Sequence, residues 1–407
     1  VFATEISSAV NYLGEEVGNY TGSIYQTLHS VFPHVIISPG QTNYYFASNS
    51  YDTVTFDIRT LSNRFVERGI KSAFFSEYVF NTLLQPEMVE SVANEIENRK
   101  GLRMNTDAKP VTYFFNLMLW DKLTGSKLGG VFQWLKNSHI TTFLIPVFIF
   151  VVFRFAYVTL FRSSQDVQQR FNSIAAIATT GFAGMALEII LIFAFQNIYG
   201  YVYENIGLII AVFMFGLALG GGISNRLILQ STSGNVLNKL NPFTMFKEGI
   251  KSEQNHDEEN CLSVAGNKVI LEEIGRQKEM DWIKIFIVIE SIIVAYACIM
   301  PFVLDQLSSL FIDSEYLFMI LVVMTGLLMG MEFPLAGKLY FLRKGELGIT
   351  AGTIDSADHA GAFIGALLTG VLFVPLFGIS GSCVIIAVLN LMSLLFFLHL
   401  YYQKRKT

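Results

Sequence analysis

Apolar residues follow one another in runs of about 20 positions over the last two thirds of the chain. About 20 apolar residues in a helix are enough to cross the roughly 30 Å hydrocarbon core of a bilayer. The pattern therefore predicts about seven transmembrane helices within residues 138–407, and an α-helical multi-pass membrane protein as the fold class. Their predicted positions are Ile140–Phe161, Ile174–Phe195, Ile206–Ile223, Ile283–Leu304, Tyr316–Leu335, Ala357–Phe377 and Ser382–Tyr402.

A polar stretch, residues 224–280, separates the third and fourth of these runs. It is rich in Ser, Asn, Lys and Glu and has no sustained apolar face. We expect a loop that carries at most one short amphipathic helix and no hydrophobic core of its own.

Residues 1–137 have the mixed pattern of a water-soluble α/β domain. Apolar residues at helical spacing predict a helix over Tyr20–Phe32, and β-rich runs predict strands over His34–Ser38 and Asn43–Ser48. Pro39-Gly40 is a turn signal, so the two strands are expected to form an antiparallel hairpin at a sheet edge. Two further helices are predicted, Asp57–Gly69 and Pro86–Lys100.

The composition supports a membrane protein and excludes a single soluble domain. Of 407 residues, 52% are hydrophobic and 15% are charged, whereas soluble domains average about 25% charged residues. The net charge is −5 and no basic block precedes the C-terminus, so we expect the lipid bilayer and no nucleic acid as a partner. The three cysteines fit neither a disulfide framework nor a zinc-binding spacing.

Lysine and arginine lie on one side of the predicted helices. The loops after spans one, three, five and seven carry these residues, and the three opposite loops, Gln196–Asn205, Asp305–Glu315 and Gly378–Gly381, carry none. The positive-inside rule then predicts a multi-pass protein of the cell (cytoplasmic) membrane with its C-terminus in the cytoplasm. The side on which residues 1–137 lie is left open.

Several motifs together resemble one family, the membrane-embedded spermidine synthase-like proteins that fuse transporter-like helices to an aminopropyltransferase domain. The segment Tyr20–His34, with Pro39-Gly40 and Phe46–Ser48, resembles the C-terminal part of that domain, where a helix leads into an antiparallel strand pair. The similar motifs in the remaining chain are Asn105–Tyr113, Gly181–Glu188, Phe215–Gly220, Glu332–Pro334 and Asp355–Ala362. The resemblance implies a partial α/β methyltransferase-like (spermidine synthase-type) domain over residues 1–137.

The resemblance also implies chemistry that this chain does not carry. The family's glycine-rich cofactor loop, ribose-binding acid and catalytic aspartate all precede the region that corresponds to Val1. Residues 1–137 contain no G-x-G-x-x-G motif, which such a cofactor requires at a helix N-terminus. We therefore expect no catalytic, cofactor-binding or metal-binding residue here, and a chain that begins inside the aminopropyltransferase domain of a longer parent.

Ionisable residues within the apolar runs form the candidate site, because such groups are costly in a membrane and are usually functional. The set consists of Arg154, Glu188, Glu290, Glu332, Asp355, Asp358 and His359. One interpretation is a cation or proton site of a transporter-like core, with Glu188 and Asp358 as its central members. The other pairs Arg154 with Glu188 and places Asp355 and Glu332 in hydrated interfacial positions.

Small residues repeat at a spacing that allows membrane helices to approach closely. The three motifs are Gly216-x-x-x-Gly220, Gly326-x-x-x-Gly330 and Gly361-x-x-x-Gly365. We expect them to pack helices together. The first two occupy matching places in successive hairpins and suggest a weak internal repeat.

Three functions remain open at this point. The resemblance implies that the parent protein transfers an aminopropyl group from decarboxylated S-adenosylmethionine to a polyamine, or has a related methyltransferase-fold activity. The acidic positions instead favour a transporter of polyamines or other organic cations. The third alternative is a non-catalytic membrane scaffold whose soluble part docks partners.

Overall fold

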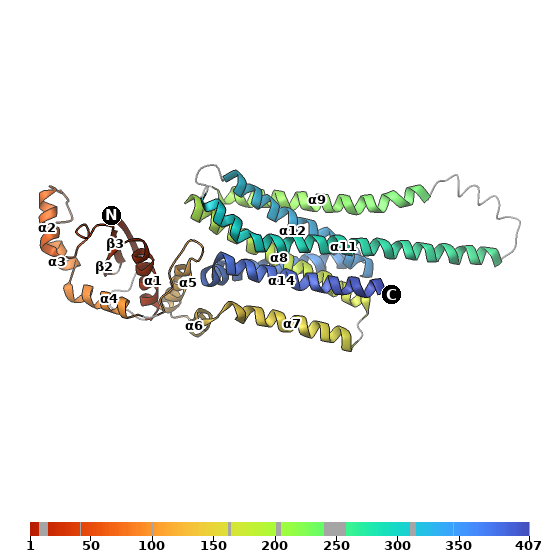
Figure 1. The fold of residues 1–407 in the computed structure, drawn as a ribbon, viewed down its shortest axis with the longest axis horizontal. Helices are drawn as coiled ribbons and strands as arrows, with labels where there is room; N and C mark the ends of the chain where they lie inside the picture. The colour runs from red at the N-terminus through yellow and green to blue at the C-terminus, as the bar shows by residue number, and fades with distance from the viewer. Residues whose placement is uncertain are drawn as a thin grey trace. The chain divides into compact units, whose positions relative to one another are not determined.

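A computed structural model describes most of the chain (Figure 1). The described residues are 1–7, 15–40, 42–99, 101–161, 164–200, 205–239, 258–309, 315–344 and 346–406, without the side chains of 231–239, 258–274 and 344. They form two compact units, one of residues 1–138 with 371–378 and one of residues 139–370 with 379–407. Each unit is described by itself.

The first unit contains a three-stranded antiparallel sheet. Its strands are β1 (Phe2–Ser7), β2 (His34–Ser38) and β3 (Thr42–Ser48), in the order β1-β3-β2. The predicted hairpin of β2 and β3 is confirmed, and β2 is an edge strand. β3 is central because β1, which the sequence pattern did not reveal, pairs with its other side.

Two helices, α1 (Glu15–Val31) and α4 (Pro86–Asn98), pack on this sheet and bury its apolar side chains. The other helices of the unit are α2 (Ile58–Glu67), α3 (Val79–Leu83), α5 (Val111–Thr124) and α6 (Gly129–Asn137), of which α5 packs on α1 and α6 packs on α5. Tyr45 of β3 is fully buried beside Leu28 of α1 and Ile96 of α4, and its hydroxyl donates to the carbonyl of Thr21 at 3.1 Å. Three antiparallel strands do not by themselves define a methyltransferase-like sheet, so that part of the expected fold stays a prediction.

The second unit is made of long helices. They are α7 (Ile140–Leu160), α8 (Gln165–Tyr199), α9 (Ile206–Lys239), α11 (Glu258–Ser309), α12 (Glu315–Lys344), α13 (Leu347–Leu368) and most of α14 (Val374–Lys406). The π-helical turn η1 (Thr369–Phe373) connects α13 to α14, and residues 371–378 of this connection belong to the first unit. Within the described residues, six helical runs are long and apolar enough to cross a membrane. The chain thus has the character of a multi-pass membrane protein, as predicted.

The sixth run, Leu347–Lys406, contains the sixth and seventh predicted spans. Its 60 residues would extend about 90 Å as one straight helix, three times the thickness of the hydrocarbon core. The run is interrupted at Gly378, whose φ of 76° and ψ of 179° belong to a backbone region open almost exclusively to glycine. A Cβ at this position would also lie 2.7 Å from the carbonyl oxygen of Ala108.

The first half of this run is parallel to α8. Gly361 of α13 lies against Ala178 of α8, and Gly365, one turn further, lies against Phe182. Residue numbers therefore increase together along the two helices.

The second half runs in the opposite direction along α8. Lys404 near the end of α14 contacts Gln169, whereas the earlier Phe396 accepts a hydrogen bond from Asn172 at 3.0 Å. The chain thus reverses between α13 and α14. Apart from the terminal Phe161, the seven predicted spans fall on helical residues, within the six helical runs described above.

The structure corrects the expectation of a loop over residues 224–280. α9 continues to Lys239 and α11 already begins at Glu258, so both flanks of this stretch are helical (Figure 1). The reason is that Leu, Glu, Lys, Arg and Gln, which are abundant there, are good helix formers even without an apolar face. Residues 240–257 lie outside the described residues.

α8 is the central helix of the second unit. Its most apolar 18 residues are 72% buried by the rest of the protein, compared with 6% for α7. α12 and α13 pack along its length, while α9 packs on α12. α8 is therefore enclosed by protein, and α7 is peripheral.

The glycine motifs pack helices together, as expected. Gly216 and Gly220 of α9 lie directly against the backbone of α12, where Gly326 and Gly330 lie directly against the backbone of α9. Gly361 and Gly365 make the same kind of contact between α13 and α8. Each contact places backbone against backbone, which a side chain would prevent.

This packing predicts that Gly220→Ala destabilises the protein. The added methyl group would collide with the carbonyl oxygen of Leu327, and separating the two backbones should cost about 1–3 kcal/mol. Gly222→Ala is the matched control, since a Cβ there meets nothing within 4 Å. Thermal unfolding in detergent should show a lower melting temperature for Gly220→Ala alone, and equal melting temperatures for the two variants would contradict this packing.

Candidate functional site: an acidic layer inside the helical unit

Glu332 of α12 is fully buried inside the second unit. One carboxyl oxygen, Oε2, forms a hydrogen bond with the hydroxyl of Thr180 on α8, and the other, Oε1, is buried without a hydrogen-bond partner. The sequence-based alternative that placed Glu332 in a hydrated interfacial position is therefore wrong. Packing by α8 and α12 removes this side chain from the surface of the bundle.

Glu290 of α11 has the same arrangement on neighbouring helices. It is fully buried, its Oε1 forms a hydrogen bond with the hydroxyl of Ser393 on α14, and its Oε2 has no hydrogen-bond partner. Glu290 and Glu332 also lie close enough to interact electrostatically. We call Thr180, Glu290, Glu332 and Ser393 the acidic layer.

The hydroxyl groups of this layer also lie near backbone carbonyl groups of their own helices. Thr180 Oγ1 lies 2.9 Å from the carbonyl oxygen of Ala176, and Ser393 Oγ lies 2.9 Å from that of Asn390. A hydroxyl has one hydrogen, so if it donates to the carbonyl, it can only accept from the carboxyl group. Each hydroxyl can therefore donate to its carboxyl group or to the carbonyl, but its single hydrogen does not serve both fully.

Polar groups continue from this layer along the same helices. The hydroxyl of Tyr296 on α11 donates to the carbonyl of Leu321 at 2.8 Å and lies 2.9 Å from the hydroxyl of Thr325 on α12. Tyr296 follows Glu290 by six residues and Thr325 precedes Glu332 by seven, so both lie about 10 Å from the acidic layer in the same direction.

Glu188 is buried on the side of α8 between its contacts with α13 and α12. It follows Gly181, which lies against Asp358 of α13, by seven residues, and Gly184, which lies against Met329 of α12, by four. Its side chain is 4% exposed and has no hydrogen bond or ion pair within the described residues. Glu188 is thus about two helical turns from Asp358 and is not part of the acidic layer.

Arg154 does not pair with Glu188, which corrects the second sequence-based interpretation. Its guanidinium group stacks on the ring of Phe171 at 4.4 Å from the centroid and lies 3.4 Å from Asn172 Oδ1. These residues precede Glu188 by 16 or 17 positions, about 24 Å along α8. The stacking contact is a cation–π interaction that holds the peripheral α7 against α8.

The three polar candidate residues of α13 differ in their exposure to solvent. Asp355 and His359 are exposed and lie 3.6 Å apart, whereas Asp358 is turned toward Gly181 and half buried. No group of three or more His, Cys, Asp or Glu side chains that could hold a metal ion occurs among the described residues.

A second polar cluster, which sequence reasoning missed, joins the same four helices near one end of the bundle. Glu279 of α11 pairs with Arg343 of α12 at 2.5 Å and with Lys404 of α14 at 2.6 Å. Gln169 of α8 accepts from Lys404 at 2.5 Å and donates to the carbonyl of Leu339 at 2.9 Å. We call Gln169, Glu279, Arg343 and Lys404 the charged layer.

The two layers are related by a constant spacing. Each helix contributes one residue to each layer, and on every helix the two residues are eleven positions apart. Eleven residues are about three turns and 16 Å of helix, so the same face of each helix lines both layers. The paired residues are Gln169 and Thr180, Glu279 and Glu290, Glu332 and Arg343, and Ser393 and Lys404.

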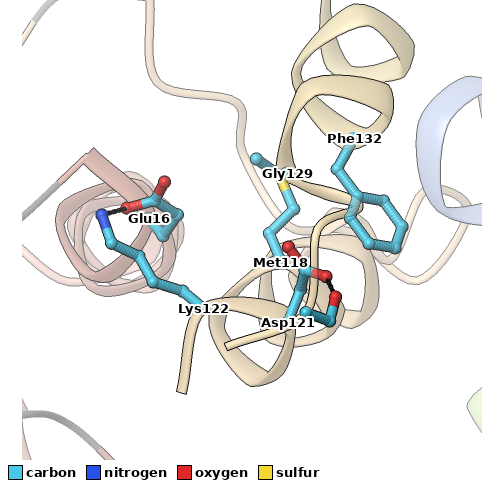
Figure 2. A pocket seen from close by; sticks show the side chains of 7 residues that line it. Glu16, Met118, Asp121, Lys122, Gly129 and Phe132 are labelled. Carbon is cyan, nitrogen blue, oxygen red and sulfur yellow. Dashed lines mark hydrogen bonds and ion pairs between the residues drawn. The ribbon is translucent and has the colours of Figure 1, made fainter. Parts of the chain in front are cut away.

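The first unit contains a small pocket among α1, α5 and α6, about 260 Å³ in volume (Figure 2). Lys122 pairs with Glu16 at 2.9 Å, and the hydroxyl of Ser126 donates to the carboxylate of Asp121, so both carboxylates already have donors. Nearby, Lys136 of α6 donates to Glu15 of α1 at 2.8 Å, and this hydrogen bond lowers the pKa of Glu15. These contacts join α1 to α5 and α6 and do not form a site.

Comparisons of the chain with protein-family models, with curated proteins and with solved structures found no match. The resemblance to the spermidine synthase-like family therefore stays a prediction. The acidic layer and the charged layer stand on their geometry alone.

The charged layer predicts that Lys404→Met destabilises the helical unit. The substitution leaves Glu279 buried with Arg343 as its remaining cation and removes a donor to Gln169, which should cost about 1–3 kcal/mol. Lys406→Met, at an exposed position of the same helix, is the control. Thermal unfolding in detergent measures both, and a loss that is the same for the two variants would mean that the charged layer contributes no stability.

Proposed function

We propose that the helical unit is a proton-coupled membrane transporter of an organic cation, with a polyamine as the substrate class. The observation that carries this proposal is the acidic layer, in which two fully buried carboxyl groups from different helices lie near each other, each with one oxygen unpartnered. Such groups are expensive in a membrane interior and usually mark a path for protons or ions.

The layer suits exchange between protons and a cation. Two neighbouring carboxyl groups away from water cannot both remain ionised, so without a cation they retain protons. An ammonium group entering between them could replace these protons and bind to the carboxylate oxygens and to the hydroxyls of Thr180 and Ser393. The donor set of two carboxyls and two hydroxyls suits an ammonium ion better than a transition metal, which prefers imidazole or thiolate ligands.

Glu332→Gln and Glu290→Gln should separate this role from a structural one. An amide is neutral and keeps the shape of a protonated carboxyl group, so both variants should fold and melt normally. Neither amide can exchange a proton for a cation, so proton-driven uptake of radiolabelled spermidine into proteoliposomes should fall at least about tenfold. Glu346→Gln, at the exposed position before α13, is the matched control and should transport normally.

Two results would contradict the proposal. Normal uptake by both variants would remove the acidic layer from the transport path. Absence of uptake by the wild-type protein under any proton gradient would favour the non-catalytic scaffold.

We also propose that the protein lies in the cell membrane with its C-terminus in the cytoplasm, because Lys and Arg gather at the ends of the helices that carry the charged layer. In a background without native cysteines, Ser308→Cys should react in intact cells with a membrane-impermeant thiol reagent, whereas Lys406→Cys should be protected. Both residues are exposed at helix ends. The reverse labelling pattern would invert the topology.

The aminopropyltransferase activity that the resemblance implies is a proposal for a longer parent protein. In that protein, decarboxylated S-adenosylmethionine would be the co-substrate and a polyamine the acceptor. Sequence upstream of Val1 that contains a glycine-rich loop between a strand and a helix would support it.

A further inference from the structure

A pocket of about 640 Å³ lies among α9, α12 and α13, outside the acidic layer. This volume is within the range of sites that bind small molecules. Most of its lining is apolar, with Phe333, Phe341 and Ile354 among the contributors, and its polar groups come from Asn225, Lys338, Thr350 and Asp355.

The side chain of Thr350 is the first observation that favours a polar ligand in this pocket. Its side chain is 4% exposed, and its Oγ1 atom is buried without a hydrogen-bond partner. A buried hydroxyl without a partner costs about 1–3 kcal/mol, which a ligand that bonds to it would recover. Thr350 lies in the first turn of α13, where Glu346 provides no side-chain cap and the helix dipole favours an anion.

The charged groups of the pocket have complementary roles. Lys338 of α12 is half buried and has no hydrogen bond or ion pair within the described residues. Asp355 of α13 is exposed, and its carboxylate contacts His359 at 3.6 Å. A phosphate group would therefore find donors at Lys338, Thr350 and the beginning of α13, and an ammonium group would find an acceptor at Asp355.

The position of the pocket along the helices suits a membrane interface. The span Glu315–Arg343 of α12 is 29 residues, about 43 Å, whereas the hydrocarbon core is about 30 Å thick. Lys338 lies five residues, about 7 Å, from the end of that span, near the boundary between hydrocarbon and headgroups. The apolar lining can then accept an acyl chain while the charged groups reach the headgroup.

We propose that this pocket binds the headgroup of a phospholipid that carries both a phosphate and a primary ammonium group, as phosphatidylethanolamine does. The phosphate lies at Lys338 and Thr350, and the ammonium group lies at Asp355. The proposal is independent of the transport function, because it uses none of the residues of the acidic layer.

Native mass spectrometry of the full chain, with lipids titrated into detergent, tests it. The wild-type protein should bind phosphatidylethanolamine about tenfold more tightly than phosphatidylglycerol, which lacks the ammonium group, or phosphatidylcholine, whose ammonium group cannot donate a hydrogen bond. Asp355→Asn should remove this preference, because it removes the carboxylate that receives the ammonium group, whereas Lys338→Met should weaken the binding of all three lipids, which share the phosphate. Thr350→Val, which keeps the side chain's shape, should weaken binding several-fold without lowering the melting temperature.

The controls distinguish the source of the headgroup. Lys406→Met should bind lipid as the wild-type protein does, since Lys406 is exposed outside the pocket. Glycerophosphoethanolamine, the same headgroup without acyl chains, should bind far more weakly. Equal binding of the three lipids, unchanged binding by Lys338→Met, or equal binding of the soluble headgroup would overturn the proposal.

Discussion

The lack of water in the hydrocarbon core is the constraint on which the helical unit depends, because every polar group there must find a partner inside the protein. Four helices, α8, α11, α12 and α14, meet most of this need by bringing their polar faces together in two layers, and one carboxyl oxygen each of Glu290 and Glu332 is the exception. The eleven-residue spacing between the layers keeps both on one face of each helix, so each helix needs only one polar face and its remaining surface can be apolar. α8 is central because it meets partners on several sides, which also explains why it is the most buried of the single helices.

Glycine contacts hold α9 and α13 to the bundle, whereas the polar layers hold α8, α11, α12 and α14 to one another. α9 approaches α12 through Gly220 and Gly330, and α13 approaches α8 through Gly361, in each case backbone to backbone. These contacts need no polar side chain, since close van der Waals packing provides the attraction. α9 and α13 therefore cover the bundle without contributing to either layer, and the pocket near Lys338 lies where these two helices and α12 meet.

The sequence predicted the elements well and the contacts between them poorly. Charged residues in apolar runs are conspicuous, so Glu290 and Glu332 could be identified, whereas Thr180 and Ser393 could not, because hydroxyl side chains are common in membrane helices. The pairing of Arg154 with Glu188 was wrong because the sequence does not fix the level at which two helices meet. Glu279 and Lys404 were overlooked as loop and tail residues. Charged positions eleven residues apart on one helix, as in Glu279 and Glu290, were the signal that could have revealed the charged layer.

The two layers together have a consequence for the proposed transport. A path along the shared helix faces from the acidic layer toward the nearer end of the bundle passes the charged layer, where Arg343 and Lys404 would repel a cation and Glu279 is already paired with both. A substrate cation could pass only after these pairs separate, which requires α11 to move relative to α12 and α14. Since Glu279 and Glu290 lie on the same face of α11, such a movement would also displace Glu290 from Ser393 and alter its contact with Glu332. If the proposed transport takes place, α11 would therefore link the release of a cation from the acidic layer to the separation of the charged layer, which is the linkage that coupled transport requires.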